Sequence, residues 1–563
     1  MSDSSDSNEV ADLSETDFFS VREERDAAVE VQRTIDEIND LFETGALPEP
    51  PILPEMENDA ANSSDSDSSD ELTDSSEEEM EMEEIEDDFG LQRQNAPERI
   101  NVMQAEMRKK ADEIIKKSFP EEYSLKQLHA LPKALRSRCS KRPRTGSFQD
   151  KIYLDAAYKF SDSCMTELTG HTGCVNALGW SSDDQFIVSG SDDKCINLYN
   201  ALGKDRTPRS RFFTGHQSNI FQSKFMPNQN NRKIVSCARD GAVRLTELDN
   251  AGCPVRLSAE EPTKVLVKHQ LSAHKLSFVH GTSVILSAGE DGRIYQIDHR
   301  EPPRNPILRL GMELNEKTIY AIDCQPNGYE FAVCGDFQNA KIFDRRNVTL
   351  LGAPERDIGV ENSTNHGITC LRYNHTGTEL LISTNDGEIH LMDIKESKVI
   401  NTYAGHQNEQ TIKGVNFYGR NSEFIVSGSD CGNLYIWDSK TASLINSQLA
   451  DGSELNPGVV NVLEPAKSIP LLATSGLDSE IKLWSPSEQV FLEDSDRVAE
   501  IKEKMTENIM SGGANRRSRF SFLDRLRLLE FMSRQEREAG SSENDDDSDD
   551  DEQEDVHPDC RQM

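Results

Sequence analysis

The chain of 563 residues contains 61 basic and 101 acidic residues, which gives a formal net charge of −40 at neutral pH. Most of the excess acid lies at the two ends, since residues 1–100 carry a net charge of −28 and residues 541–563 carry −10. Acidic ends repel phosphate groups, so this distribution argues against direct binding of nucleic acid. The sequence shows no signal peptide and no apolar run of the roughly 18 residues that a membrane-spanning helix needs, so no membrane partner is expected.

Both acidic ends have too few apolar side chains to bury a core, so residues 1–100 and 541–563 are predicted to be mostly disordered. Two interpretations of these tails remain open. They are either solvated flanks, or segments that are phosphorylated by acid-directed kinases or bind basic partners. Within the first tail, the spacing of apolar residues over 17–44 predicts a helix that ends before Gly45.

The next segment, residues 101–150, is a basic linker with a second candidate helix over residues 101–117. Its basic run, residues 133–144, contains no acidic residue and ends with Lys141, Arg142 and Arg144. Such a run is typical of a nuclear-import signal, and the other interpretation is a solvated linker. We favour import, because no aromatic residues are interleaved for stacking on bases. The sequence therefore predicts a protein of the nucleus and the cytoplasm.

Residues 151–488 repeat one pattern of short apolar runs separated by turns. In the clearest unit, residues 405–438, alternating apolar residues predict three antiparallel strands, and the unit closes on Trp437 and Asp438. The equivalent closing positions are Tyr199, Thr246, Ile297, Phe343, Met392, Trp437 and Trp484, spaced 45–51 residues apart. One unit cannot bury both faces of its sheet, so seven units in series predict an all-β, seven-bladed propeller of WD-type repeats.

A further strand is predicted at residues 159–168, ahead of the first repeat. In a closed propeller, such a strand completes the last blade as its outermost strand and leaves no open sheet edge. Residues near 160 should therefore pair with residues near 485.

Histidine and aspartate recur at fixed places of the repeat, where we expect a structural role. In the first unit, His171 is predicted to hydrogen-bond the turn residue Asp193 and the hydroxyl of Ser189. Similar positions hold His216, Asp240, Asp291, Asp386, His406 and Asp478. In the third unit, the opening Gly-His pair weakens to Ala273-His274.

Residues 489–540 are predicted to form a linker followed by a basic amphipathic helix at 516–537. That helix either docks on the surface of the propeller or binds a partner, and the flanking acids argue against contact with anionic lipid.

The sequence contains no phosphate-binding loop, serine-nucleophile elbow, zinc-protease motif or dinucleotide fingerprint. Its 11 cysteines include no pair at zinc-binding spacing. We therefore expect a protein that is not an enzyme and that holds neither a metal nor a cofactor.

Two consecutive units end on Asp-x-Arg, with Asp298 and Arg300 in the third unit and Asp344 and Arg346 in the fourth. Side chains two residues apart in a strand point to the same side, so each pair should project together near the rim of one propeller face. A single pair of this kind is best interpreted as an ion pair that closes a blade. Two neighbouring pairs favour a binding site.

These endings, together with GHTGCVNAL (170–178), CARDGAVRL (237–245) and SEFIVSGSDCG (422–432), resemble the WD-repeat substrate receptors of cullin-4 ubiquitin ligases. The resemblance spans about residues 125–486. It implies that Arg300 and Arg346, oriented by Asp298 and Asp344, bind the adaptor damage-specific DNA-binding protein 1 (DDB1). It also implies that another surface recruits an unidentified protein for ubiquitination, and that the helix at 101–117 reaches the adaptor.

The chain departs from that family at three positions: Ile297 and Phe343 stand where the motif prefers Trp or Tyr, and Phe337 replaces the turn aspartate of the fourth unit. The acidic tails favour an alternative from another class, a chaperone or scaffold propeller that binds histones or other basic proteins.

Overall fold

The computed structural model describes residues 96–120, 145–255, 263–302, 304–312, 315–359, 367–409, 411–453, 458–487 and 490–515. All of them belong to one compact unit, Gly90–Met563, and the other unit, Met1–Phe89, lies outside the described residues. The helices predicted at 17–44 and 516–537 and the basic run with Lys141, Arg142 and Arg144 also lie outside them.

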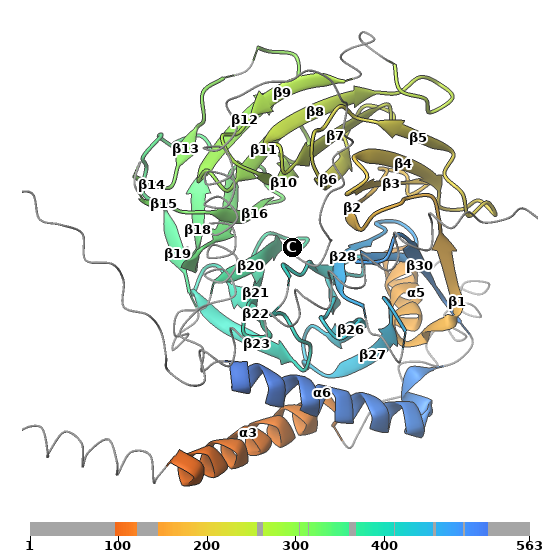
Figure 1. Cartoon of the computed structure of the whole chain (residues 1–563), viewed down its shortest axis with the longest axis vertical. Helices are drawn as coiled ribbons and strands as arrows, with labels where there is room; N and C mark the ends of the chain where they lie inside the picture. The colour runs from red at the N-terminus through yellow and green to blue at the C-terminus, as the bar shows by residue number, and fades with distance from the viewer. Residues whose placement is uncertain are drawn as a thin grey trace, which may run out of the picture. The chain divides into compact units, whose positions relative to one another are not determined.

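Seven four-stranded antiparallel sheets surround a common axis as the blades of a propeller (Figure 1). Blade one contains β2 (Val175–Trp180), β3 (Phe186–Ser191), β4 (Cys195–Asn200) and β5 (Ser210–Phe213). Blade two contains β6 (Ile220–Phe225), β7 (Lys233–Ala238), β8 (Ala242–Glu247) and β9 (Lys264–Lys268). Blade three contains β10 (Ala273–Phe278), β11 (Val284–Gly289), β12 (Arg293–Asp298) and β13 (Leu308–Arg309). Blade four contains β16 (Ile319–Cys324), β17 (Glu330–Gly335), β18 (Phe337–Asp344) and β19 (Arg356–Ile358).

Blade five contains β20 (Ile368–Tyr373), β21 (Glu379–Thr384), β22 (Glu388–Asp393) and β23 (Lys398–Ala404). Blade six contains β24 (Val415–Tyr418), β25 (Phe424–Ser427), β26 (Asn433–Asp438) and β27 (Leu444–Leu449). Blade seven contains β28 (Val460–Pro465), β29 (Leu472–Gly476), β30 (Ile481–Pro486) and β1 (Phe160–Leu168). A two-stranded ribbon, β14 (Gly311–Met312) and β15 (Asn315–Glu316), connects blades three and four.

The blades bury apolar side chains on both faces, because each sheet packs against the next one. All four residues of β25 are buried, and the closing residues Trp437 and Trp484 are fully buried. The predicted seven-bladed propeller is thus confirmed, and every predicted closing position lies in the third strand of its blade.

Strand β1 closes the ring by pairing with β30, as the sequence predicts. Leu168 pairs with Ile481, and Met165 pairs with Trp484. The Ser485 hydroxyl also donates a hydrogen bond of 2.7 Å to the carbonyl oxygen of Cys164. Residues at both ends of the propeller therefore share one sheet.

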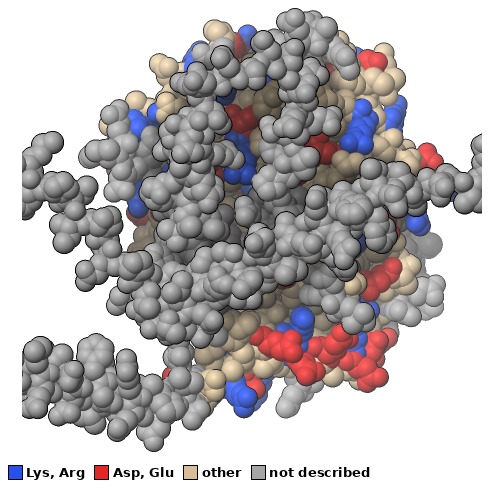
Figure 2. All heavy atoms as spheres, in the orientation of Figure 1, with Lys and Arg blue, Asp and Glu red and all other residues tan. Residues whose placement is uncertain are grey.

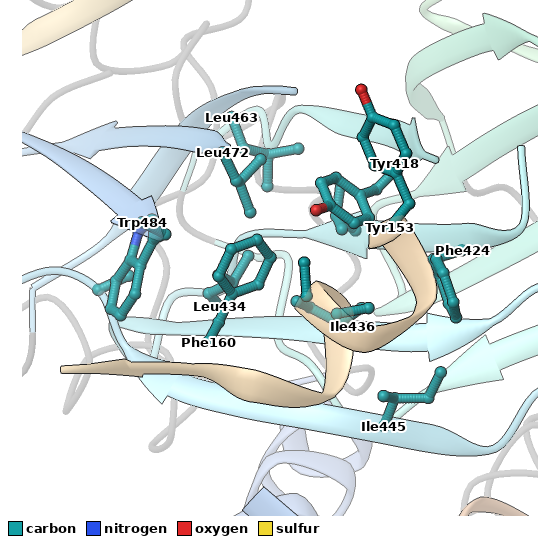
Figure 3. Close-up of a cluster of buried hydrophobic side chains, with 14 of the residues drawn as sticks. Tyr153, Phe160, Tyr418, Phe424, Leu434, Ile436, Ile445, Leu463, Leu472 and Trp484 are labelled. Atoms are coloured by element: carbon teal, nitrogen blue, oxygen red, sulfur yellow. The ribbon is translucent and has the colours of Figure 1, made fainter. Parts of the chain in front are cut away.

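Helix α5 (Thr145–Lys159) leads into β1 and packs against β27 and β30. Its Tyr153, together with the first strand residue Phe160, lies in a buried cluster with Tyr418 and Trp484 (Figure 3). The ring centroids of Tyr153 and Phe160 lie 5.4 Å and 5.5 Å from that of Tyr418. The predicted propeller start at residue 151 lies within helix α5, and the first strand follows this helix.

Helices α3 (Ala96–Ser118) and α6 (Ser495–Asn515) pack against each other at the edge of the ring near β23 and β27 (Figure 1). Lys502 of α6 lies over the ring of Phe119 at 4.7 Å, and Lys110 of α3 forms a 2.7 Å ion pair with Glu388 of blade five. In Figure 2 acidic side chains gather over the edge where α6 lies. None of the described helices is both long and apolar enough to cross a membrane.

A short 3-10 turn, η2 (Phe491–Glu493), connects blade seven to α6. Helix α6 lies in the segment 489–540, at a place where the sequence predicts a linker ahead of a later helix. It forms because Val498, Ile501 and Met505 lie on one face at helical spacing, and this face packs on the buried cluster of blades five and six.

Candidate functional site

The two Asp-x-Arg pairs lie at equivalent places of neighbouring blades. Strand β12 ends at Asp298 and β18 ends at Asp344, and the inner strands β10 and β16 of these blades pack against each other. The connections that follow third strands all leave on one face of a propeller, opposite the turns between second and third strands. Arg300 and Arg346 therefore project from the same face of the ring.

Arg300 is held by its own aspartate in a two-pronged ion pair. Its Nε donates to Asp298 Oδ1 at 2.9 Å, and its Nη2 donates to Asp298 Oδ2 at 2.6 Å. The backbone N–H of Arg300 donates to the same carboxylate at 3.1 Å. Hydrogen bonds from Arg300 hold the pKa of the Asp298 carboxyl well below its usual range, so this carboxyl stays ionised. The Arg300 side chain is nonetheless 69% exposed.

Arg346 repeats this arrangement and adds an aromatic contact. Its Nε donates to Asp344 Oδ1 at 3.0 Å, its Nη2 donates to Oδ2, and its backbone N–H donates to Oδ1 at 2.8 Å. Its guanidinium carbon lies 4.3 Å from the ring centroid of Tyr329. Hydrogen bonds from Arg346 lower the pKa of the Asp344 carboxyl. The Arg346 side chain is 60% exposed.

Both guanidinium groups are oriented and still able to bind. Each uses Nε and Nη2 on its own aspartate, so Nη1 has no hydrogen-bond partner among the described residues. A rigid fork of this kind binds carbonyl or carboxylate oxygens with little loss of side-chain entropy. The arrangement can anchor a protein surface that presents such acceptors.

The neighbouring residue Arg345 joins the two blades. Its Nη1 donates to Gln296 Oε1 in blade three at 3.3 Å, and its Nε donates to the carbonyl oxygen of Gly328 at 3.4 Å. A hollow of about 40 Å³ beside Asp298 is lined by Val265, Pro302 and other residues of blades two and three.

The departures from the family motif fill the core of their blades. Ile297 is buried, and Phe343 is buried and stacks on Phe331 with ring centroids 5.6 Å apart. Phe337 pairs directly with Gly335, so this short turn between β17 and β18 has no need of a capping aspartate. The substitutions thus leave the Asp344–Arg346 pair in the same geometry as Asp298–Arg300.

The predicted structural triad is present in blade one. His171 Nδ1 lies 2.9 Å from Asp193 Oδ2, and His171 Nε2 lies 2.7 Å from the Ser189 hydroxyl. Blade two repeats this arrangement, because His216 contacts Asp240 at 3.1 Å and the hydroxyl of Ser236 at 3.0 Å.

The histidine of blade three is one that the sequence analysis missed. His269, not His274, contacts Asp291 Oδ1 and the Ser287 hydroxyl, both at 2.9 Å. His274 lies inside β10, where it contacts Glu290 at 2.7 Å. The spacing to the turn aspartate could have identified His269, since 22 residues separate it from Asp291, as in His171 and Asp193 of blade one.

Blade six departs furthest from the predicted triad. His406 is buried, and neither of its ring nitrogens has a hydrogen-bond partner among the described residues. Cys431 occupies the place of the turn aspartate, and the amide of Asn508 from α6 enters instead. That amide donates to the carbonyl oxygen of Gly405 at 2.9 Å and to the Tyr435 hydroxyl at 3.3 Å.

The unpartnered His406 predicts acid sensitivity. Burial lowers the pKa of His406 from 6.5 to about 4. Between these values the unfolded chain binds a proton that the folded chain excludes, so stability falls as the pH drops from 6.5 to 4. The loss reaches about 3 kcal/mol at the lower limit, at 1.36 kcal/mol for each pKa unit.

The variant His406→Gln cannot be protonated and should lose this part of the pH dependence. The measurement is the free energy of unfolding in denaturant at pH 4.5 and 7.5, for the variant and for the wild type. His280, whose side chain lies in an exposed turn, supplies the control His280→Gln. Equal pH dependence in wild type and His406→Gln would show that His406 does not contribute.

The remaining repeat positions serve turns and strand contacts. Asp386 Oδ1 accepts hydrogen bonds from the Thr384 hydroxyl and from the backbone N–H of Glu388, and the histidine position of blade five lies outside the described residues. Asp438 accepts from the backbone N–H of Thr441 at 2.8 Å, and Asp478 accepts from that of Gly452 at 3.0 Å.

In blade seven an acid stands beside the turn aspartate. Burial and the charge of Asp478 raise the pKa of the Asp451 carboxyl to about 7. Trp484 Nε1 donates to the Thr474 hydroxyl at 2.8 Å.

Over the described part of the chain, no group of three or more His, Cys, Asp or Glu residues is arranged to hold a metal ion.

Comparisons with known proteins identify the repeats. A family model described as "WD domain, G-beta repeat" matches residues 162–200 and 207–246, and the "Anaphase-promoting complex subunit 4 WD40 domain" matches residues 355–419. The chain is 31% identical over 276 residues to WD repeat protein iqw1 of Schizosaccharomyces pombe, and the aligned region covers 44% of this chain and 34% of the relative. It is 34% identical over 249 residues to DDB1- and CUL4-associated factor 6 of Homo sapiens, which covers 41% of this chain and 28% of the relative.

Protein ALTERED SEED GERMINATION 2 of Arabidopsis thaliana is 29% identical over 266 residues, 40% of this chain and 35% of the relative. The chain thus spans about a third of the length of these relatives. The repeat models match segments of every blade except blade three, and the described strands form seven blades of one construction. The chain is a WD-repeat protein built on a seven-bladed β-propeller.

Proposed function

We propose that this protein is a non-catalytic substrate receptor of a cullin-4 ubiquitin ligase, and that it binds the adaptor DDB1 through Arg300 and Arg346. The observation that carries this proposal is the pair of exposed, aspartate-held guanidinium groups on one face of neighbouring blades. The name of the human relative, DDB1- and CUL4-associated factor 6, supports the same kind of partner. Ubiquitin transfer would then take place on other subunits, and this chain would bring the protein to be modified.

Within this group of receptors, we propose that the chain is most similar to cullin-4-associated factor 8. The basis is the blade sequences at 170–178, 237–245 and 422–432, and the acidic segments that flank the same propeller.

The direct test is affinity capture of the tagged full chain from cells, followed by mass spectrometry and by reconstitution with purified DDB1. Stoichiometric capture of DDB1 and cullin-4 is expected. A purified chain that does not bind purified DDB1 would refute the proposal.

The acidic tails support the second candidate, a chaperone or scaffold propeller that binds histones or other basic proteins, because residues 1–100 alone carry a net charge of −28. Deletion of residues 1–95 and 541–563 separates the two functions. A receptor keeps DDB1 when it loses the tails, whereas a chaperone loses its basic partner. Retained histone binding without the tails would exclude the tail-based mechanism.

We further propose that the basic run at 133–144 directs part of the protein to the nucleus, with the remainder in the cytoplasm. Replacing Lys141, Arg142 and Arg144 with alanine should remove three positive charges that an import receptor needs. The expected result is a cytoplasmic shift of a fluorescently tagged chain. The control replaces the exposed Lys395, Lys398 and Lys440, which lie in blades five and six. An unchanged nuclear fraction would exclude this segment as the import signal.

A further inference from the structure

Exposed apolar side chains lie in two connections of blade four, one of which also contains Arg346. Tyr329 is 50% exposed, Leu350 is 49% exposed and Leu351 is 73% exposed. Tyr329 lies in the connection between β16 and β17, and both leucines lie in the connection between β18 and β19, which also contains Arg346. Large apolar side chains in water cost free energy that is regained when a partner covers them.

These side chains sit on a firmly held backbone. The Tyr329 N–H donates to Asn327 Oδ1 at 3.0 Å, and the Tyr329 carbonyl oxygen accepts from the Arg345 N–H at 2.8 Å. Leu350 and Leu351 are the central residues of a turn in which the Gly352 N–H donates to the carbonyl oxygen of Thr349 at 2.9 Å. These exposed side chains therefore lie on an ordered surface, so the binding of a partner costs little conformational entropy.

The blade fold does not require apolar residues in this turn. The corresponding connection of blade five contains Lys395, Glu396 and Ser397, and that of blade six contains Ser439, Lys440 and Thr441. Polar residues of this type are the usual choice for solvent-facing turns. Blade one has one exposed leucine in the corresponding connection, Leu202, which stands two residues after the end of β4, the place that Arg346 holds after β18.

We propose that Tyr329 and the turn leucine Leu351 belong to the surface that binds the adaptor, with Tyr329 positioning Arg346 and Leu351 packing against an apolar side chain of DDB1. This inference rests on the proposed function. Tyr329 supports the guanidinium from its open side, at 4.3 Å, while Asp344 holds its edge. The fork is thereby fixed in two directions before the partner arrives. Tyrosine and arginine are both enriched in interface hot spots, so a stacked Tyr329–Arg346 pair is suited to anchor an interface.

The test measures the dissociation constant of the purified full chain for purified DDB1. Tyr329→Ala should weaken binding about 5-fold, because it removes a cation–π contact and buried ring area. Tyr329→Phe keeps the ring and should bind like the wild type, which separates positioning by the ring from any role of the hydroxyl. Leu351→Ser should weaken binding about 10-fold. The control Leu202→Ser, which changes an exposed leucine in the connection between β4 and β5 of blade one, should bind like the wild type.

The outcomes distinguish this inference from the proposed function. If Arg300→Ala with Arg346→Ala abolishes binding while Tyr329→Ala and Leu351→Ser bind normally, the inference is overturned and the proposed function stands. If the double arginine variant binds normally, both are overturned. Equal weakening by Leu202→Ser and Leu351→Ser would overturn the assignment to blade four. The oligomeric state of each variant is measured by size-exclusion chromatography. If Leu351→Ser loses self-association but binds DDB1 normally, the turn contacts a second copy of this chain and the inference is overturned.

Discussion

Replacing both Arg300 and Arg346 with alanine is expected to abolish adaptor binding and to leave the thermal unfolding of the propeller unchanged. Both side chains are mostly exposed, and each contacts its own aspartate two residues earlier, so their removal breaks no contact between blades. At the interface the loss is much larger, because acceptors on the partner would remain buried without a donor. We expect the affinity for DDB1 to fall at least about 100-fold.

The measurement pairs a quantitative pull-down of DDB1 with a thermal melt of each variant. Lys398→Ala is the matched control, since Lys398 is 75% exposed and pairs with Glu396, also two residues earlier, at 3.3 Å. Normal binding by the double arginine variant with a wild-type melt would refute the assignment. A collapsed melt would show instead that the two ion pairs hold the blades together. Replacement of the arginines by glutamate should also abolish binding, because it adds repulsion to the lost contacts.

The repeat made most of the propeller predictable. Alternation of apolar residues and a period near 47 residues located all seven third strands, and the extra strand at 159–168 followed from the need to close the ring. The same alternation placed Arg300 beside Asp298 and Arg346 beside Asp344. These relations are local in sequence, so periodicity alone reveals them.

Contacts between distant segments were not predictable in this way. Tyr329 precedes Arg346 by 17 residues and meets it only because two connections of blade four lie together. Asn508 donates to the Gly405 carbonyl oxygen and to the Tyr435 hydroxyl of blade six from a helix that follows the whole propeller. No sequence period links such residues. Helix α6 does have a local sequence signal, because Val498, Ile501 and Met505 recur at helical spacing.

The second large effect is expected from loss of the closing strand. A chain that starts at residue 170 lacks α5 and β1, so it leaves β30 as an open edge and uncovers the cluster that contains Trp484. Phe160 is fully buried in that cluster, and replacing this one residue with Ala is expected to cost about 3–5 kcal/mol. Total stabilities of domains lie at about 5–15 kcal/mol. The shorter chain should therefore lose cooperative unfolding and aggregate through its open edge.

The control is a chain that starts at residue 145, which keeps α5 and β1 and differs from the shorter chain by these elements and Thr169. It should unfold in one transition near that of the full chain. Phe160→Ala in the full chain gives the graded version of the test, with a lower melting temperature but a retained fold. The measurements are circular dichroism during heating and light scattering at 25 °C. If the chain from residue 170 stayed monomeric and melted with the longer one, the pairing of β1 with β30 would not be what holds the ring closed. In that case the packing between blades one and seven, where the Ser475 hydroxyl donates to the carbonyl oxygen of Val175 at 2.8 Å, would have to close it instead.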